Sequence, residues 1–126
     1  AALGVSEVVV EDDLRETAFG DWDGYSFAEV ALRWPKELER WLASTAVAPP
    51  FGESFDAVER RVTAARERIT QAHHGATVLL VSHVTPIKAL VRLALDAPPQ
   101  ALFRMELSPV NVDALVDLLL RATVRP

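Results

Sequence analysis

The segment from Thr77 to Lys88 constrains the fold most, because an apolar run ends there and a helical pattern begins. Val78 to Val81 are consecutive aliphatic residues without polar alternation, a pattern typical of a strand buried on both faces of a parallel sheet. Thr85 is a favourable N-cap and Pro86 suits the first helical position, so we expect a helix directly after His83. This arrangement places His83 at a strand end and a helix N-terminus, where α/β proteins bind ligands and anions.

His83 alone leaves two interpretations open. A histidine at the end of a strand can bind a ligand, or it can simply be a packing residue with a satisfied hydrogen bond. The choice between them depends on the rest of the chain.

Length and composition predict one globular domain over residues 1–126, since half of the residues are hydrophobic and a quarter are charged. A net charge of -5 without a basic run gives no reason to expect nucleic-acid binding. The chain has no cysteine, which excludes disulfides and thiolate chemistry and fits a cytoplasmic location. No apolar run approaches the roughly 20 residues that a membrane span needs.

The N-terminal part of the chain predicts a short strand followed by an ordered loop. Val8 to Val10 form a β-branched run, and the segment from Leu14 to Gly24 then sets aromatic residues between glycines and acids. Gly20 and Gly24 break both helical and strand periodicity there. This segment is either a loop that carries function or an acidic surface loop anchored by its aromatic residues.

The middle of the chain predicts helices with identifiable starts. Ser26 and Glu29 form a capping box, and Pro35 divides that helical region in two. Ser54 then caps the clearest amphipathic helix of the chain. Its charged face is expected to be solvated; this face carries Glu59, Arg60, Arg66, Glu67 and Arg68. The helix is expected to end at Gly75.

His73 and His74 precede Gly75 at the C-terminal end of this helix. A protonated imidazole is favoured there by the helix dipole. Because no third ligand is suitably spaced, the sequence predicts no metal site.

Four motifs in order resemble the histidine phosphatase superfamily, which includes phosphoglycerate mutases, acid phosphatases and α-ribazole phosphatases. The motifs are Leu14-Arg15-Glu16, Phe19 to Gly24, Gly52-Glu53-Ser54 and Val78 to His83, and the resemblance extends roughly from Gly4 to Met105. The Ser-His-Val-Thr-Pro run, with Val84 after the histidine, is most similar to the phosphatase domain of bifunctional ribonuclease H/acid (α-ribazole) phosphatase proteins.

This resemblance implies an α/β three-layer sandwich with a mostly parallel central sheet, of the phosphoglycerate mutase type. It implies hydrolysis of a small phosphorylated substrate through a phosphohistidine, without a cofactor. By position, His83 matches the second histidine of the site and Glu16 the acid, while Thr85 and Ser82 match substrate-binding positions. These roles suit phosphoryl transfer, which depends on positioning, charge neutralisation and one proton for the leaving oxygen.

The chain also departs from the family pattern. It contains no Arg-His-Gly, the motif that supplies the nucleophile, and it opens where the family would already have formed its first strands. We therefore expect an N-terminally truncated domain that is inactive in isolation. The strand at 78–81 would then have an unpaired edge, which favours self-association or coverage by residues 107–120. The end of the chain, 110–120, fits a helix and a strand equally well.

Two alternatives stay open from the sequence. The chain is a non-catalytic remnant that binds phosphate or a partner, or it belongs to a mutase that transfers the phosphoryl group rather than releasing it. The region from Phe27 to Phe51 is mostly apolar and does not identify the substrate.

Overall fold

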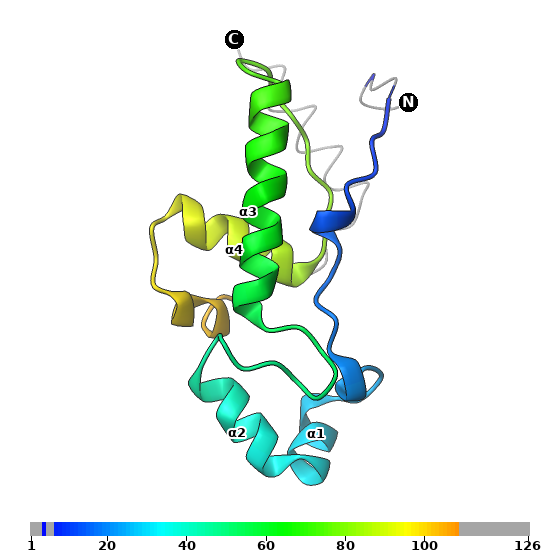
Figure 1. Cartoon of the computed structure of the whole chain (residues 1–126), viewed down its shortest axis with the longest axis vertical. Helices are drawn as coiled ribbons and strands as arrows, with labels where there is room; N and C mark the ends of the chain where they lie inside the picture. The colour runs from blue at the N-terminus through cyan, green and yellow to red at the C-terminus, as the bar shows by residue number, and fades with distance from the viewer. Residues whose placement is uncertain (1–3, 5–6, 109–126) are drawn as a thin grey trace. The chain divides into compact units, whose positions relative to one another are not determined.

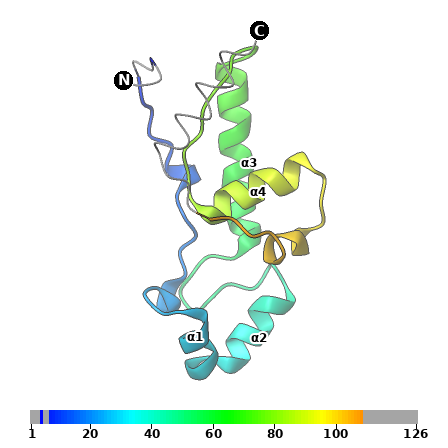
Figure 2. The ribbon, with the colours of Figure 1, turned by 180° about the vertical axis from the view of Figure 1, so that it is seen from behind.

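The computed structural model describes residue 4 and residues 7–108 (Figures 1 and 2). The chain divides into two units, of which residues 11–106 form the larger and residues 1–10 with 107–126 the smaller. All helices described below belong to the larger unit. In chain order they are η1 (Asp12–Leu14), η2 (Gly20–Trp22), α1 (Phe27–Arg33), α2 (Pro35–Ala43), α3 (Phe55–Ala72), α4 (Val84–Ala94) and η3 (Pro99–Phe103).

The described part of the chain contains no β-strand, so the expected central sheet is not present in it. Val8 to Val10 are 75–87% exposed and Val78 to Val81 are 36–79% exposed, and both runs lack regular secondary structure. The prediction of a buried strand at Val78 to Val81 is therefore wrong for this structure. A strand needs neighbours that pair with its backbone and cover its side chains, and within the described residues neither run has such a neighbour. The predicted segment 110–120 lies outside the described residues.

The capping box that begins α1 is confirmed. The Ser26 hydroxyl accepts from the Glu29 N–H at 3.2 Å, and the Glu29 carboxylate accepts from the Ser26 N–H at 2.8 Å. The helix ends at Arg33 with Trp34 as its C-cap, and Pro35 begins α2 as predicted. A proline suits this position because the first N–H groups of a helix have no partner within it.

The long amphipathic helix is also confirmed as α3, with the Ser54 hydroxyl accepting from the Ala57 N–H at 3.2 Å. The helix after the histidine exists, but it begins at Val84, so His83 is its N-cap and the predicted cap, Thr85, lies inside it. Pro86 is consequently the third helical residue. This is tolerated because the whole first turn lacks intrahelical acceptors for its N–H groups.

The two long helices cross each other in both views, with α4 lying against α3 (Figures 1 and 2). Arg92 of α4 forms an ion pair with Glu59 of α3, and its Nε lies 2.8 Å from the Glu59 carboxylate. Glu59 was expected on the solvated face of its helix, so that expectation is corrected for this residue. None of the described helices combines the length and the apolar character that a membrane span requires.

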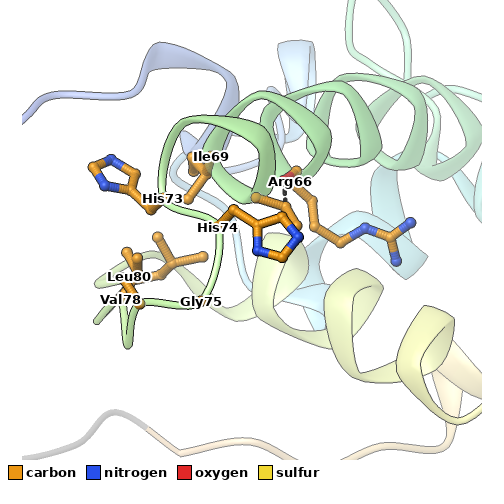
Figure 3. Close-up of a pocket in the computed structure, with 9 residues that line it drawn as sticks. Arg66, Ile69, His73, His74, Gly75, Val78 and Leu80 are labelled. Carbon is orange, nitrogen blue, oxygen red and sulfur yellow. Dashed lines mark hydrogen bonds between the residues drawn. The ribbon is translucent and has the colours of Figure 1, made fainter.

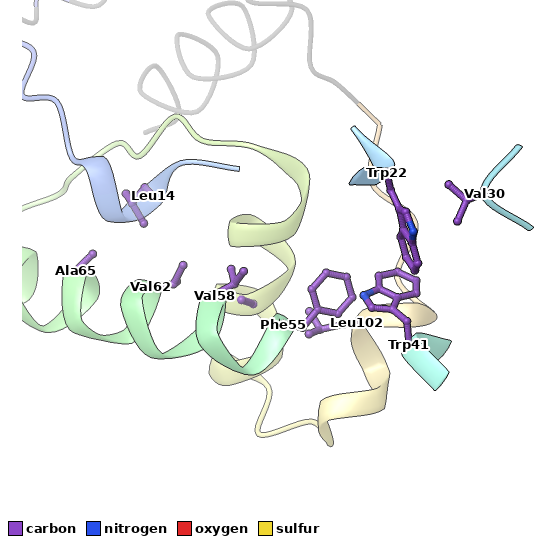
Figure 4. Packing of buried hydrophobic residues seen from close by; sticks show 10 residues of the cluster. Leu14, Trp22, Val30, Trp41, Phe55, Val58, Val62, Ala65 and Leu102 are labelled. Carbon is purple, nitrogen blue, oxygen red and sulfur yellow. The ribbon is translucent and has the colours of Figure 1, made fainter. Parts of the chain in front are cut away.

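An aromatic cluster around Trp41 forms the centre of the core (Figure 4). The Trp41 side chain is 5% exposed, and its ring centroid lies 5.0–6.4 Å from those of Phe19, Trp22, Phe27, Phe55 and Phe103. These rings come from the loop over residues 14–24 and from α1, α3 and η3. Trp41 of α2 therefore joins segments that are distant in sequence. The aromatic residues of the loop are therefore packed into the core, as expected.

Candidate functional site

The candidate site is built around Glu16, which follows η1 in a segment without regular secondary structure. Side chains from distant parts of the chain hold the backbone of residues 13–16, here called the Glu16 segment. The carbonyl oxygens of Asp13, Arg15 and Glu16 accept hydrogen bonds from Arg61 of α3 at 2.6, 2.8 and 3.2 Å. The remaining carbonyl, that of Leu14, accepts from the Ser82 hydroxyl at 2.6 Å.

Arg61 also binds a carboxylate, because its Nε and Nη2 donate to the two oxygens of Glu53 at 2.8 and 2.9 Å. The Arg61 side chain is 9% exposed and that of Glu53 is 17% exposed, so the pair is largely shielded from water. The hydrogen bond from Arg61 lowers the pKa of the Glu53 carboxyl below its ordinary value. Glu53, the middle residue of the Gly-Glu-Ser motif, is therefore ionised. Through Arg61 it is linked to the backbone of the Glu16 segment.

The Glu16 carboxylate lies next to the beginning of α4. One oxygen accepts from the Thr17 N–H at 2.7 Å, and the other lies 3.5 Å from the Thr85 N. The structure thus brings Glu16 next to the helix that begins immediately after His83.

The four residues predicted for the site differ in their environment. Glu16 and Ser82 are half-buried, Thr85 is buried, and the side chain of His83 is exposed. The Ser82 hydroxyl donates its hydrogen bond to the Leu14 carbonyl, and the Thr85 N–H points to Glu16. Ser82 therefore contacts the Glu16 segment through the Leu14 carbonyl, and Thr85 contacts Glu16 itself. His83 lies between Ser82 and Thr85 in the sequence.

Two glycines explain how the motifs around residues 20 and 52 come together. Gly20 has a φ of +58°, and a Cβ on it would lie 2.1 Å from the Pro50 carbonyl oxygen and 2.6 Å from the Gly52 N. Backbone hydrogen bonds join the same segments, from the Asp21 N–H to Pro50 and from the Glu53 N–H to Ala18, at 2.9 and 2.8 Å. Only residues without a side chain allow this approach, which delivers Glu53 to Arg61.

The histidine pair at the end of α3 belongs to a separate hollow of about 370 Å³ (Figure 3). Its walls include Ile69, Val78 and Leu80 beside the two histidines, and the imidazoles of His73 and His74 point in different directions. Within the described residues, no group of three or more His, Cys, Asp or Glu side chains is arranged to hold a metal ion.

Sequence reasoning missed Arg61, although the pattern contained a signal for it. Arg61 follows Val58 by three residues and precedes Ala65 by four, so it shares a helix face with buried residues rather than the solvated face. A charged residue on a buried face needs a partner, and the acidic residue of the Gly-Glu-Ser motif stands two helical turns earlier.

Comparison with known proteins places these features in a family. Residues 1–116 match the sequence profile of the histidine phosphatase superfamily (branch 1). The chain is 58% identical over 101 residues to a bifunctional protein of Mycobacterium tuberculosis, which covers 80% of this chain and 28% of that protein. It is 34% identical over 85 residues to phosphoserine phosphatase 1 of Hydrogenobacter thermophilus, which covers 67% of this chain and 40% of that protein.

Two solved structures are similar to the chain. The protein YhfR of Bacillus stearothermophilus superposes with a TM-score of 0.67 at 31% identity, covering 76% of this chain and 48% of that protein. A mycobacterial glucosyl-3-phosphoglycerate phosphatase superposes with a TM-score of 0.63 at 28% identity, covering 76% of this chain and 50% of that protein. The chain thus spans less than a third of its bifunctional relative and about half of each of these structures.

Proposed function

Because the chain belongs to the histidine phosphatase superfamily, we propose that it contributes the acid and the second histidine to a phosphomonoester hydrolase in its complete protein. The observation that carries this proposal is the position of the Glu16 carboxylate, 3.5 Å from the Thr85 N in the first turn of the helix capped by His83. Two similar proteins are named as phosphatases of small phosphorylated molecules, phosphoserine and glucosyl-3-phosphoglycerate.

In this proposal the phosphoryl group of the substrate binds at the N-terminus of α4. A protonated Glu16 gives its proton to the departing oxygen, and the His83 imidazole steadies the group in transfer. The Thr85 N–H, now directed at Glu16, would donate to a phosphate oxygen. Ser82 would assist by holding the Leu14 carbonyl, since its only proton is already used there.

The nucleophile is assigned to sequence outside these 126 residues, because they contain no Arg-His-Gly. In the covalent mechanism the nucleophilic histidine takes the phosphoryl group while the leaving alkoxide takes the proton of Glu16, and water then releases phosphate. We accordingly expect the 126-residue chain alone to hydrolyse phosphomonoesters at the background rate, because loss of a nucleophile costs many powers of ten.

We also propose that Val78 to Val81 pair as a strand once neighbouring strands are available. Their aliphatic sequence and their exposure of 36–79% support this proposal. An uncovered run of this kind invites pairing with another chain, so the 126-residue chain is expected to self-associate. Sedimentation should show oligomers whose fraction rises with concentration, and a monomer at all concentrations would contradict this expectation.

The test of the function uses the complete protein and an alkyl phosphomonoester, whose leaving oxygen needs a proton. His83→Ala and Glu16→Gln should each lower kcat/KM by about 10²-fold or more, the usual contribution of a positioned acid or base. Glu67→Gln, on the exposed face of α3, is the matched control and should leave the activity unchanged. Full activity in His83→Ala would contradict the proposal.

The same assay separates the two alternatives. A non-catalytic remnant would bind phosphate without any turnover in the complete protein. A mutase would transfer the phosphoryl group to an organic acceptor faster than to water.

A further inference from the structure

We propose that Arg61 is the positioning residue that fixes the acid Glu16 for proton delivery, an inference that rests on the proposed phosphatase function. Its guanidinium bonds go to Glu53 and to backbone carbonyls, and none of them reaches the Glu16 carboxylate or the first turn of α4. Its effect is on the backbone that carries Glu16.

The guanidinium of Arg61 uses every donor that it has. An arginine side chain offers five N–H groups in a fixed planar fork. Here two bind the Glu53 carboxylate, and the others bind the carbonyl oxygens of Asp13, Arg15 and Glu16. The distances run from 2.6 to 3.2 Å, so all five donors form close hydrogen bonds. One side chain therefore fixes the peptide units on both sides of the Glu16 Cα.

This arrangement restricts both the backbone and the side chain of Glu16. Its backbone is held by Arg61, and its carboxylate is held between the Thr17 N–H and the Thr85 N. A lysine at position 61 has three donors on a compact ammonium group, so it cannot replace a fork that serves a carboxylate and three carbonyls. In Arg61→Lys the backbone of the Glu16 segment should shift, so that Glu16 no longer lies beside α4.

The chain offers a matched control on the same helix. Arg68 also contacts the chain just before Glu16, but it binds the side chains of Glu11 and Asp13 rather than backbone carbonyls. Its own side chain is 52% exposed. Arg68→Lys removes an equivalent guanidinium from α3 without touching the backbone of Arg15 or Glu16.

Leaving-group dependence distinguishes positioning of an acid from a merely structural role. An alkyl phosphate has a poor leaving group that needs a proton in the transition state, whereas the phenolate of p-nitrophenyl phosphate departs without one. A variant that misplaces the acid should therefore lose kcat/KM on the alkyl ester selectively. A variant that merely destabilises the protein should lose the same factor on both esters.

The experiment measures kcat/KM of the complete protein on glycerol phosphate and p-nitrophenyl phosphate. Arg61→Lys should lose about tenfold or more on the alkyl ester and less than about threefold on the aryl ester, in the direction of Glu16→Gln. Arg68→Lys should change neither rate. Equal losses on both esters, or no loss on either, in Arg61→Lys would overturn the inference.

A second readout does not depend on turnover. The Thr85 N lies 3.5 Å from the Glu16 carboxylate and outside the Glu16–Thr17 peptide unit that Arg61 binds, so the NMR shift of the Thr85 amide proton in threonine-labelled complete protein reports where that carboxylate lies. Arg61→Lys should move this shift toward its value in Glu16→Gln, whereas Arg68→Lys should leave it in place. An unchanged shift in Arg61→Lys would overturn the inference.

The two readouts separate the failure of this inference from the failure of the proposed function. If the unsubstituted protein hydrolyses neither ester, the proposed function fails, while the Thr85 amide shift still decides whether Arg61 positions Glu16. If Arg61→Lys does not fold, Glu53→Gln replaces it, since the amide keeps the shape of Glu53 but accepts with only one oxygen. It should show the same pattern to a smaller extent, and equal losses on both esters would again contradict positioning.

Discussion

Gly20→Ala should destabilise the protein far more than Gly24→Ala, although both glycines have a positive φ. The values are +58° for Gly20 and +84° for Gly24. An alanine in this region of backbone space costs about 1–2 kcal/mol through its Cβ. That strain is common to both substitutions, so the difference between them isolates the effect of packing.

The packing around the two positions is very different. At Gly20 the added Cβ would lie 2.1 Å from the Pro50 carbonyl oxygen and 2.6 Å from the Gly52 N, while at Gly24 nothing lies within 4 Å. The atoms near Gly20 belong to the backbone, so they cannot rotate away as a side chain would. Overpacking of this kind costs typically about 1–3 kcal/mol. We therefore expect a loss of about 2–5 kcal/mol for Gly20→Ala and about 1–2 kcal/mol for Gly24→Ala.

The assay is thermal melting followed by tryptophan fluorescence, because Trp22 and Trp41 are buried in the core that this loop contacts. At roughly 4 °C per kcal/mol for a domain of this size, Gly20→Ala should melt about 4–12 °C below Gly24→Ala. Equal melting temperatures for the two variants would refute the conclusion that the close approach of residues 20 and 52 stabilises this fold.

Three further predictions concern the core, the acid dependence of stability and a helix cap. Trp41→Ala should cost about 3–5 kcal/mol in urea unfolding, because it removes the centre of the aromatic cluster; a loss below about 1 kcal/mol would contradict that role. Because Arg61 lowers the pKa of Glu53, their contribution to stability is complete above the unfolded value of about 4.3 and is lost as the pH falls through the lower folded pKa. The stability difference between the natural protein and Glu53→Gln should therefore shrink below about pH 4, and a pH-independent difference would count against the pair. Ser26→Ala should cost about 1 kcal/mol in thermal melting by removing the capping box of α1, whereas an unchanged melting temperature would show that the cap contributes nothing.

The helices were predictable because their signals are local. The capping box at Ser26, the proline at position 35 and the serine at position 54 each satisfy or avoid unpaired N–H groups at a helix start, whatever the rest of the chain does. The start of α4 was displaced because His83 takes the N-cap without a side-chain hydrogen bond, so no residue preference marked it.

The sheet was not predictable in the same way, because a strand depends on partners that are distant in the sequence. Val78 to Val81 have the residues of a buried strand, but their pairing requires neighbours that local pattern cannot supply. The same reasoning explains why the predicted strand at Val8 to Val10 is also exposed and irregular.

Parts of the candidate site followed from the motifs, and parts did not. Glu16 and Thr85 were proposed from the motif positions, and the structure places the carboxylate of one beside the N–H of the other. The roles of Arg61 and Ser82 as donors to the carbonyls of the Glu16 segment were not foreseen. Motifs record which side chains meet a ligand, whereas such backbone contacts depend on how distant segments approach each other.

The most direct measurement follows NMR signals of His83 and Glu16 in the complete protein during titration with orthovanadate, which mimics a phosphoryl group in transfer. If both residues serve one phosphomonoester site, the His83 imidazole and Glu16 carboxyl signals should shift together with a single midpoint. Vanadate binding that shifts neither signal, or shifts the two with different midpoints, would contradict the account.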